Sequence, residues 1–244
     1  VYKRQPSSNT NGGLIASGNI LGETVYIQNS GVNGITSNAN VTSQGNVMIT
    51  NNNGDINLVS GDVAGNNVTI SNSNQAGSLT TNANINASGI ALIENAGKGD
   101  MTVGGSVQGS IVSLQNQTYD IVTPRKVIKN EHAEDDNSEN DNNNNLIILE
   151  VKRSDKDSAN KDGGLVVNGS VYGDSAFIQN AGKGGITTNN SSIIASDVII
   201  TNDNGSVNIN DGMIYGNDVI ISNSNKGNKS VSYTHLRAHE TSAH

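Results

Sequence analysis

The chain has 244 residues, a formal charge of −8 at pH 7 and no cysteine, and aromatic residues make up only 3% of it. The negative charge argues against nucleic acid and anionic membrane surfaces as partners, and the lack of cysteine excludes a disulfide framework. Apolar runs are no longer than four or five residues, so the sequence predicts no insertion into a membrane.

The two ends of the chain do not follow the pattern of the rest. Residues 1–5 and 232–241 resemble translated sequencing-adapter sequence, and we leave them out of the fold prediction. The repeat pattern then divides the chain into a tail over 1–12, repeat coils over 13–117, an insertion over 118–163, further coils over 164–230 and an adapter-like tail over 231–244.

A five-residue pattern occurs eight times, first as Val25-Tyr26-Ile27-Gln28-Asn29. Its first position is Val or Ala, its third is Ile or Leu, and its fifth is always Asn. Successive asparagines are 21–23 residues apart, except for one spacing of 64. Self-similarity at such a period is typical of a solenoid. The eight recurrent asparagines are Asn29, Asn51, Asn72, Asn95, Asn116, Asn180, Asn202 and Asn223.

Each repeat carries two further aliphatic columns, which indicate three short strands per coil. One column precedes the asparagine and begins at Ile20 and Val41; the other follows it and begins at Ile35 and Ile56. Such short strands cannot satisfy their own backbone groups, so each must pair with its equivalent about 4.8 Å away in the next coil. We therefore predict an all-β protein, a right-handed parallel β-helix of about eight coils of 21–23 residues.

The recurrent asparagine is predicted to be structural. We expect it to adopt a left-handed backbone at a turn, with its amide hydrogen-bonded to the asparagines of the coils above and below. The alternative is a contact with a glycan or an ion. The structural interpretation is favoured because a turn must recur in every coil, whereas a binding site need not.

The 64-residue spacing equals one coil of 21 residues plus about 43 more. The extra residues, roughly 118–161, contain apolar segments around Pro124 and at 146–152. Between them, residues 131–145 hold six acids and no Lys or Arg. A charged segment with so few apolar residues has no core to bury. We predict a β-hairpin outside the helix, with a disordered acidic tip that is the best candidate for a partner-binding element.

Catalysis finds little support in the sequence. Parallel β-helices include polysaccharide lyases and hydrolases, which need clustered carboxylates on one outward face. Positions two and four of the pattern should point outward, and Glu94 is the single acid among these sixteen positions. We therefore predict a protein that is not an enzyme and binds no cofactor.

One acidic column is a candidate metal site. Asp197 and Asp218 each lie five residues before their asparagine, and Asp174 lies six before its own. Stacked coils would bring Asp197 and Asp218 close enough to share a hard cation such as calcium. The alternative is that aspartate occurs before strands because it makes local hydrogen bonds in turns.

The repeat resembles the haemagglutinin repeats of filamentous-haemagglutinin-like exoproteins. The resemblance rests on the period of about 21 residues and on three segments, GNVMI at 45–49, GNNVTI at 65–70 and GNDVII at 216–221. It covers about 14–117 and 164–226. Autotransporter passenger domains give similar patterns.

The resemblance implies a structural segment of an adhesin that is extracellular or bound to a Gram-negative cell surface. Its expected partners are an outer-membrane secretion partner and a glycan or protein on a host or neighbouring cell. The alternatives are a polysaccharide lyase or hydrolase and a passive surface-layer or fibre spacer.

Overall fold

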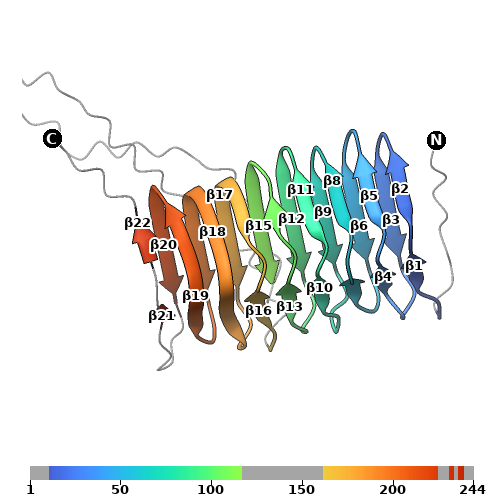
Figure 1. Cartoon of the computed structure of the whole chain (residues 1–244). Coiled ribbons are helices and arrows are strands. Elements are labelled where there is room, and N and C mark those ends of the chain that lie inside the picture. Colours follow the sequence, from blue (N-terminus) through green and yellow to red (C-terminus); the bar gives the residue numbers. More distant parts are fainter. Residues whose placement is uncertain (1–10, 117–161, 225–230, 234–235, 239–244) are drawn as a thin grey trace, which may run out of the picture. The chain divides into compact units, whose positions relative to one another are not determined.

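The computed structural model describes residues 11–116, 162–224, 231–233 and 236–238, in which strands and turns alternate and no helix occurs. The chain divides into two compact units, residues 1–118 with 158–244, and residues 119–157. The second unit lies outside the described residues, as does the hairpin predicted over 118–161. The first unit is a parallel β-solenoid of about eight coils (Figure 1).

A coil has three strand positions, and most of them are filled by separate short strands. The first strands are β1 (Leu14–Ala16), β4 (Ile35–Ser37), β7 (Ile56–Leu58), β10 (Leu79–Thr81), β13 (Met101–Val103) and β16 (Gly164–Val167). The second are β2 (Asn19–Gly22), β5 (Asn40–Ser43), β8 (Asp62–Gly65), β11 (Asn84–Ala87) and β14 (Val107–Gln108). The third, which carry the five-residue pattern, are β3 (Val25–Asn29), β6 (Val47–Asn51), β9 (Val68–Asn72), β12 (Ile90–Asn95), β15 (Ile111–Asn116) and β20 (Asp218–Asn223).

In the later coils neighbouring strands merge, because pairing with the adjacent coil continues through the corners between them. The merged strands are β17 (Val171–Asn180), β18 (Gly185–Asn202) and β19 (Val207–Gly216). Each coil pairs in parallel with the next, and the repeat sets the register: Ile27 lies opposite Ile49, and Ile49 opposite Ile70. The predicted fold class, all-β with stacked parallel coils, is confirmed.

The core is a narrow aliphatic column inside the stack. Positions one and three of the pattern are buried from Val25 to Ile200, and in the last coil Val219 and Ile221 are partly buried. Met101 and Leu165 belong to the column of the first strands and are fully buried. Each buried aliphatic side chain contributes about 1.5–3 kcal/mol, so the stability of the array grows with the number of coils.

The left-handed backbone predicted for the recurrent asparagines is wrong. The non-glycine residues with positive φ are Asn190 and Asp211 among those described, whereas Asn29 is simply the last residue of β3. Glycines supply the left-handed turn instead, as Gly34 does with a φ of 68°. A Cβ atom at Gly34 would meet the backbone oxygen of Asp55 at 2.0 Å, so only glycine fits between the coils there.

The coils on the two sides of the 64-residue spacing stack without a missing row. Asn116 lies opposite Asn180 in parallel register, and Met101 lies opposite Leu165. The repeat therefore resumes at Gly164 in register with the coils that end at Asn116. This agrees with a spacing of one coil plus about 43 residues.

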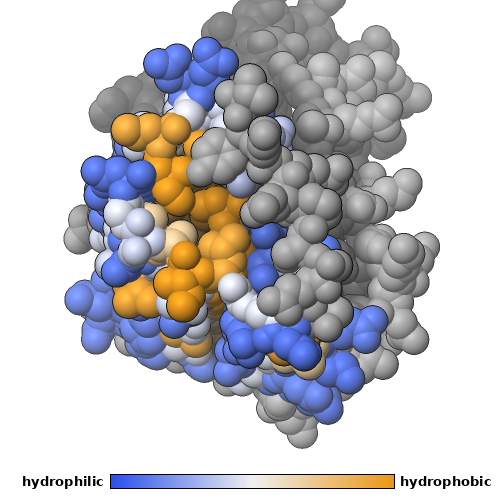
Figure 2. Space-filling model, turned by 90° about the vertical axis from the view of Figure 1, so that its right-hand side faces the viewer, coloured by the Kyte–Doolittle hydropathy of each residue, from blue (hydrophilic) through white to orange (hydrophobic). Residues whose placement is uncertain are grey.

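The first coil presents apolar side chains at one end of the stack. Ile15 is 84% exposed and Leu21 71% exposed, and the partly buried Leu14 and Ile20 lie against the core. Figure 2 shows this hydrophobic area with hydrophilic side chains along part of its border. Among the described residues, β1, β2 and β3 pair on one side only.

The sequence after residue 230 does not stop pairing where the predicted tail begins. β21 (Val231–Tyr233) and β22 (Leu236–Ala238) both pair in parallel with β19. Backbone hydrogen bonding imposes no requirement on side-chain pattern, so a segment outside the repeat can still add to the open edge of the last coil.

Deleting residues 118–160 should leave the solenoid folded. The deletion joins Gln117 to Lys161 and restores a 21-residue spacing between Asn116 and Asn180. A roughly tenfold shorter loop costs about 2 kcal/mol less to close, so the melting temperature followed by circular dichroism should stay the same or rise. A deletion extended to Val167, which also removes β16, is the control and should lower it. Loss of cooperative unfolding in the shorter deletion would contradict the prediction.

Candidate functional site

The recurrent asparagines form a buried ladder. The side-chain amide of Asn29 donates to the side-chain oxygen of Asn51 at 2.8 Å. The same bond, in the same direction, joins Asn51 to Asn72, Asn95 to Asn116, Asn116 to Asn180, Asn180 to Asn202 and Asn202 to Asn223, at 2.8–3.3 Å. The ladder thus crosses the insertion between Asn116 and Asn180, as the sequence predicted.

Most of the ladder amides also donate to a carbonyl of the turn that follows them. Asn51 donates to the carbonyl of Gly54 at 2.9 Å and Asn180 to that of Gly182 at 2.8 Å. Asn116 donates to Gly164 at 2.9 Å, a carbonyl on the far side of the insertion. Because the N–H groups of these amides donate to neighbouring asparagines and to turn carbonyls, the ladder is a structural element.

The ladder is interrupted once. The amide of Asn72 donates to the carbonyl of Ser78 at 2.9 Å, inside its own turn, and no bond joins it to Asn95. The side-chain oxygen of Asn95 is buried without a partner. The turn after Asn72 is the longest among the regular coils, with six residues before Leu79. It draws the amide of Asn72 away from the coil above.

The predicted acid pair is brought together. Asp197 and Asp218 occupy the same register position on β18 and β20. Burial raises the pKa of Asp197, the charge of Asp218 raises it further, and the hydroxyl of Ser175, which donates to Asp197 at 3.4 Å, lowers it. The residue opposite Asp197 in the preceding coil is Ser175, so Asp174 does not belong to this column.

A cation would relieve the repulsion between Asp197 and Asp218. No group of three or more His, Cys, Asp or Glu side chains suited to a metal ion occurs in the described part of the chain. The acid pair therefore offers two carboxylates from the protein, and calcium binding stays a prediction.

Several positions predicted to point into solvent are buried instead. They are Ser113, Gln115, Gln179 and Ile199, on the strands before and after the insertion point. The amide of Gln115 donates to the hydroxyl of Ser113 at 2.8 Å. On the same side of the coils, burial raises the pKa of Glu94, which accepts a hydrogen bond from Ser71 at 3.3 Å.

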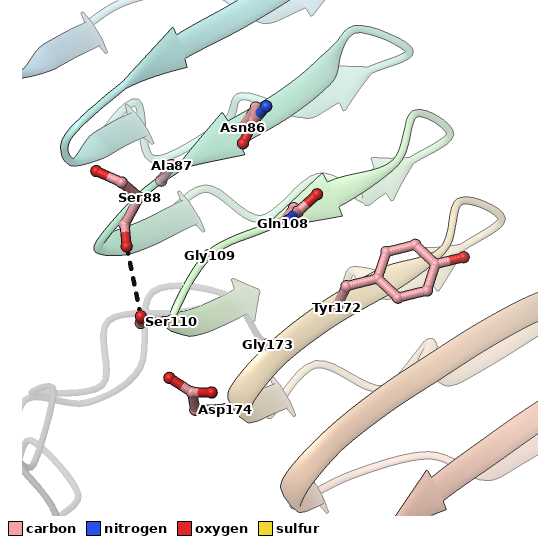
Figure 3. A pocket seen from close by; sticks show the side chains of 9 residues that line it. All are labelled: Asn86, Ala87, Ser88, Gln108, Gly109, Ser110, Tyr172, Gly173 and Asp174. Carbon is pink, nitrogen blue, oxygen red and sulfur yellow. Dashed lines mark hydrogen bonds between the residues drawn. The ribbon is translucent and has the colours of Figure 1, made fainter. Parts of the chain in front are cut away.

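A depression of about 480 Å³ lies on the outer surface of β11, β14 and β17. Two rows of exposed side chains line it (Figure 3). One row is Asn86, Gln108 and Tyr172, which stack in register on successive coils. The other is Ser88, Ser110 and Asp174.

The floor between the two rows is made of small residues, Ala87, Gly109 and Gly173. A Cβ atom added at Gly173 would lie 2.6 Å from the backbone oxygen of Gly109, so the chain can turn this corner only with a residue of minimal size. The backbone is held by the bond from the N–H of Asp174 to the carbonyl of Ser110 at 2.9 Å.

The sequence does not reveal this depression. Tyr172 and Asp174 lie 64 residues after Gln108 and Ser110 in the chain, and only the register across the insertion places them side by side. The one available signal is the row of small residues two positions after the second aliphatic column, as in Gly65, Gly109 and Gly173.

Comparisons of the sequence with protein-family models, with curated proteins and with solved structures found no match. In the described residues no helix is long and apolar enough to cross a membrane.

Replacing Asn180 by Ala should destabilise the solenoid by about 2–3 kcal/mol. The change removes two ladder bonds and leaves the buried oxygen of Asn202 without its donor. Asn189 is the matched control, because it makes two equivalent asparagine bonds, to Asn168 and from Asn210, at exposed positions. Water replaces these bonds, so Asn189→Ala should cost less than about 0.5 kcal/mol. Equal losses in urea unfolding would contradict a special role for the buried ladder.

Calcium should raise the melting temperature of the wild-type chain if Asp197 and Asp218 share it, since a ligand that binds only the folded state stabilises that state. Asp197→Asn or Asp218→Asn should abolish the rise. Without calcium, Asp218→Asn should raise the melting temperature at neutral pH, because a raised pKa means that ionised Asp197 disfavours the fold. Scanning calorimetry checks both; a wild type indifferent to calcium would remove the metal hypothesis.

Proposed function

We propose that this chain is a structural segment of a secreted or cell-surface adhesin of the haemagglutinin-repeat type. In this role the solenoid acts as a stiff support that presents binding surfaces on its outer rows and in the insertion after Asn116. The proposed location is outside the cell, on or near a Gram-negative outer membrane. The proposed partners are a surface glycan or protein on another cell and an outer-membrane secretion partner.

One observation carries the proposal. The coils keep the same register across the whole stack, including the step from Asn116 to Asn180 across 64 residues. A parallel stack with a buried hydrogen-bonded ladder resists bending between coils, because any tilt would break bonds in a dry interior. A support of this kind tolerates variation on its surface, since outward side chains do not determine the register.

Two other functions compete with adhesion. A polysaccharide-degrading enzyme would need a second carboxyl group beside Glu94, the outward acid with a raised pKa. A passive spacer would need no ligand at all. The haemagglutinin-type resemblance of segments such as GNVMI at 45–49 favours the adhesin over both.

Adhesion is tested with the fluorescently labelled full chain on cultured epithelial cells and on Gram-negative bacterial cells. We expect saturable binding to at least one cell type, lost when the chain is heat-unfolded. The variant lacking 118–160 shows whether the insertion or the solenoid is responsible. Absence of binding to both cell types would favour the spacer. Release of reducing ends from pectin, mannan or glycosaminoglycan would overturn the proposal in favour of an enzyme.

A further inference from the structure

We propose that the depression lined by β11, β14 and β17 is a binding site for a neutral glycan, with the ring of Tyr172 as its platform. This inference deepens the proposed adhesive function and rests on it. It assigns the ligand to a class, uncharged polysaccharide, and the contact to named residues on the solenoid rather than to the insertion.

Tyr172 supplies an apolar surface in a position that solvent can reach. It is 37% exposed in a chain with only 3% aromatic residues. A tyrosine ring combines a flat apolar face with a polar tip. Pyranose rings have a matching character, with a face of C–H bonds bordered by hydroxyl groups. Stacking of the sugar face on the ring of Tyr172 would remove apolar surface from water on both partners.

The side chains around Tyr172 suit hydroxyl groups. Asn86 and Gln108 each carry an amide that can both donate and accept, and the carboxylate of Asp174 accepts only. A sugar hydroxyl also donates and accepts, so one hydroxyl can bridge an amide and a carboxylate. Figure 3 shows Tyr172 and Asp174 on either side of Gly173, with Asn86 and Gln108 in the row of the ring.

The coil spacing gives the site the form of a track. Asn86, Gln108 and Tyr172 are in register on three successive coils, about 4.8 Å apart. A chain-like ligand lying along the stack can meet each of them in turn, whereas a compact small molecule would reach only one or two. The geometry therefore favours an oligosaccharide over a single sugar.

The charge of the site sets the class of glycan. Among the described residues that line the depression, Asp174 is the one that carries a charge, and the whole chain carries a formal charge of −8. Uronate and sulfated glycans would be repelled by the carboxylate and by this net charge. A neutral polysaccharide is repelled by neither the carboxylate nor the net charge.

The floor of the depression is pre-formed. Two backbone hydrogen bonds hold it in place. The N–H of Gly109 donates to the carbonyl of Tyr172 at 3.1 Å, and the N–H of Asp174 donates to the carbonyl of Ser110 at 2.9 Å. The hydroxyl of Ser110 further donates to the carbonyl of Ser88 at 3.4 Å. Because this surface is already ordered, binding a ligand costs little conformational entropy.

The test uses the full chain and isothermal titration with neutral hexasaccharides of glucose, mannose, xylose and galactose, and with hexagalacturonate as the charged probe. We expect at least one neutral hexasaccharide to bind, with hexagalacturonate at least tenfold weaker. Tyr172→Ala should weaken neutral binding at least tenfold. Asp174→Asn should weaken neutral binding several-fold. It should also reduce the difference in affinity between the neutral hexasaccharide and hexagalacturonate, because the repelling carboxylate is gone.

The matched control is Tyr215→Ala. Tyr215 is in the same outward row two coils further on, and it is also 37% exposed, but it lies outside the depression. Its removal should leave affinity within twofold, and the melting temperature of each variant reports whether it folds. Equal effects of the two tyrosine variants, equal binding of hexagalacturonate, or no binding of any neutral hexasaccharide would each overturn the inference.

The result is separable from the proposed function. A chain that adheres to cells but binds none of the neutral hexasaccharides refutes the glycan site and leaves the adhesin proposal standing. A chain that does neither refutes both. Cell binding that is lost in Tyr172→Ala and kept in Tyr215→Ala places the adhesive contact in the depression.

Discussion

The hydrogen bonding of short strands is the constraint on which this structure depends. A strand of three to six residues cannot satisfy its own N–H and C=O groups, so every coil must copy the backbone of its neighbour. The 21-residue period, the parallel register and the aliphatic columns such as Ile27, Ile49 and Ile70 all follow from this demand. Glycines such as Gly34 are required where one coil's turn approaches the next too closely for a Cβ atom.

The asparagine ladder is a second set of bonds between equivalent positions of adjacent coils, made by side chains instead of the backbone. Its amides bond along the stack and to the turn carbonyls, so they fix where each coil bends. The bonds from Asn116 to Gly164 and to Asn180 hold the coils on the two sides of the 64-residue spacing in register. The defect at Asn95 follows from turn length: the turn after Asn72 is one residue longer than the next longest turns, and its Ser78 carbonyl accepts the amide of Asn72, so the buried oxygen of Asn95 is left unsatisfied.

Binding functions of such a solenoid are confined to residues that the stacking of the coils does not require. The inward columns and the ladder determine the fold, and the outward rows and the insertion are left to vary. Our two proposals use only these: an adhesive surface segment, and a neutral-glycan site in which Tyr172 and Asp174 flank a floor of small residues. The buried outward positions Ser113 and Gln115 show that not every outer row remains open to solvent.

The sequence by itself determined the all-β class, the period, the buried columns, the asparagine ladder and the place of the insertion. These follow from a pattern that recurs in every coil, and recurrence makes them visible without coordinates. Other details were decided only by the tertiary structure. The recurrent asparagines end strands, while glycines such as Gly34 take the positive φ. Asp197 lies opposite Ser175 and not Asp174, and Tyr172 lies in one row with Asn86 and Gln108. Those contacts depend on turn length and on the register across 64 residues, and a one-residue shift in either would pair different side chains.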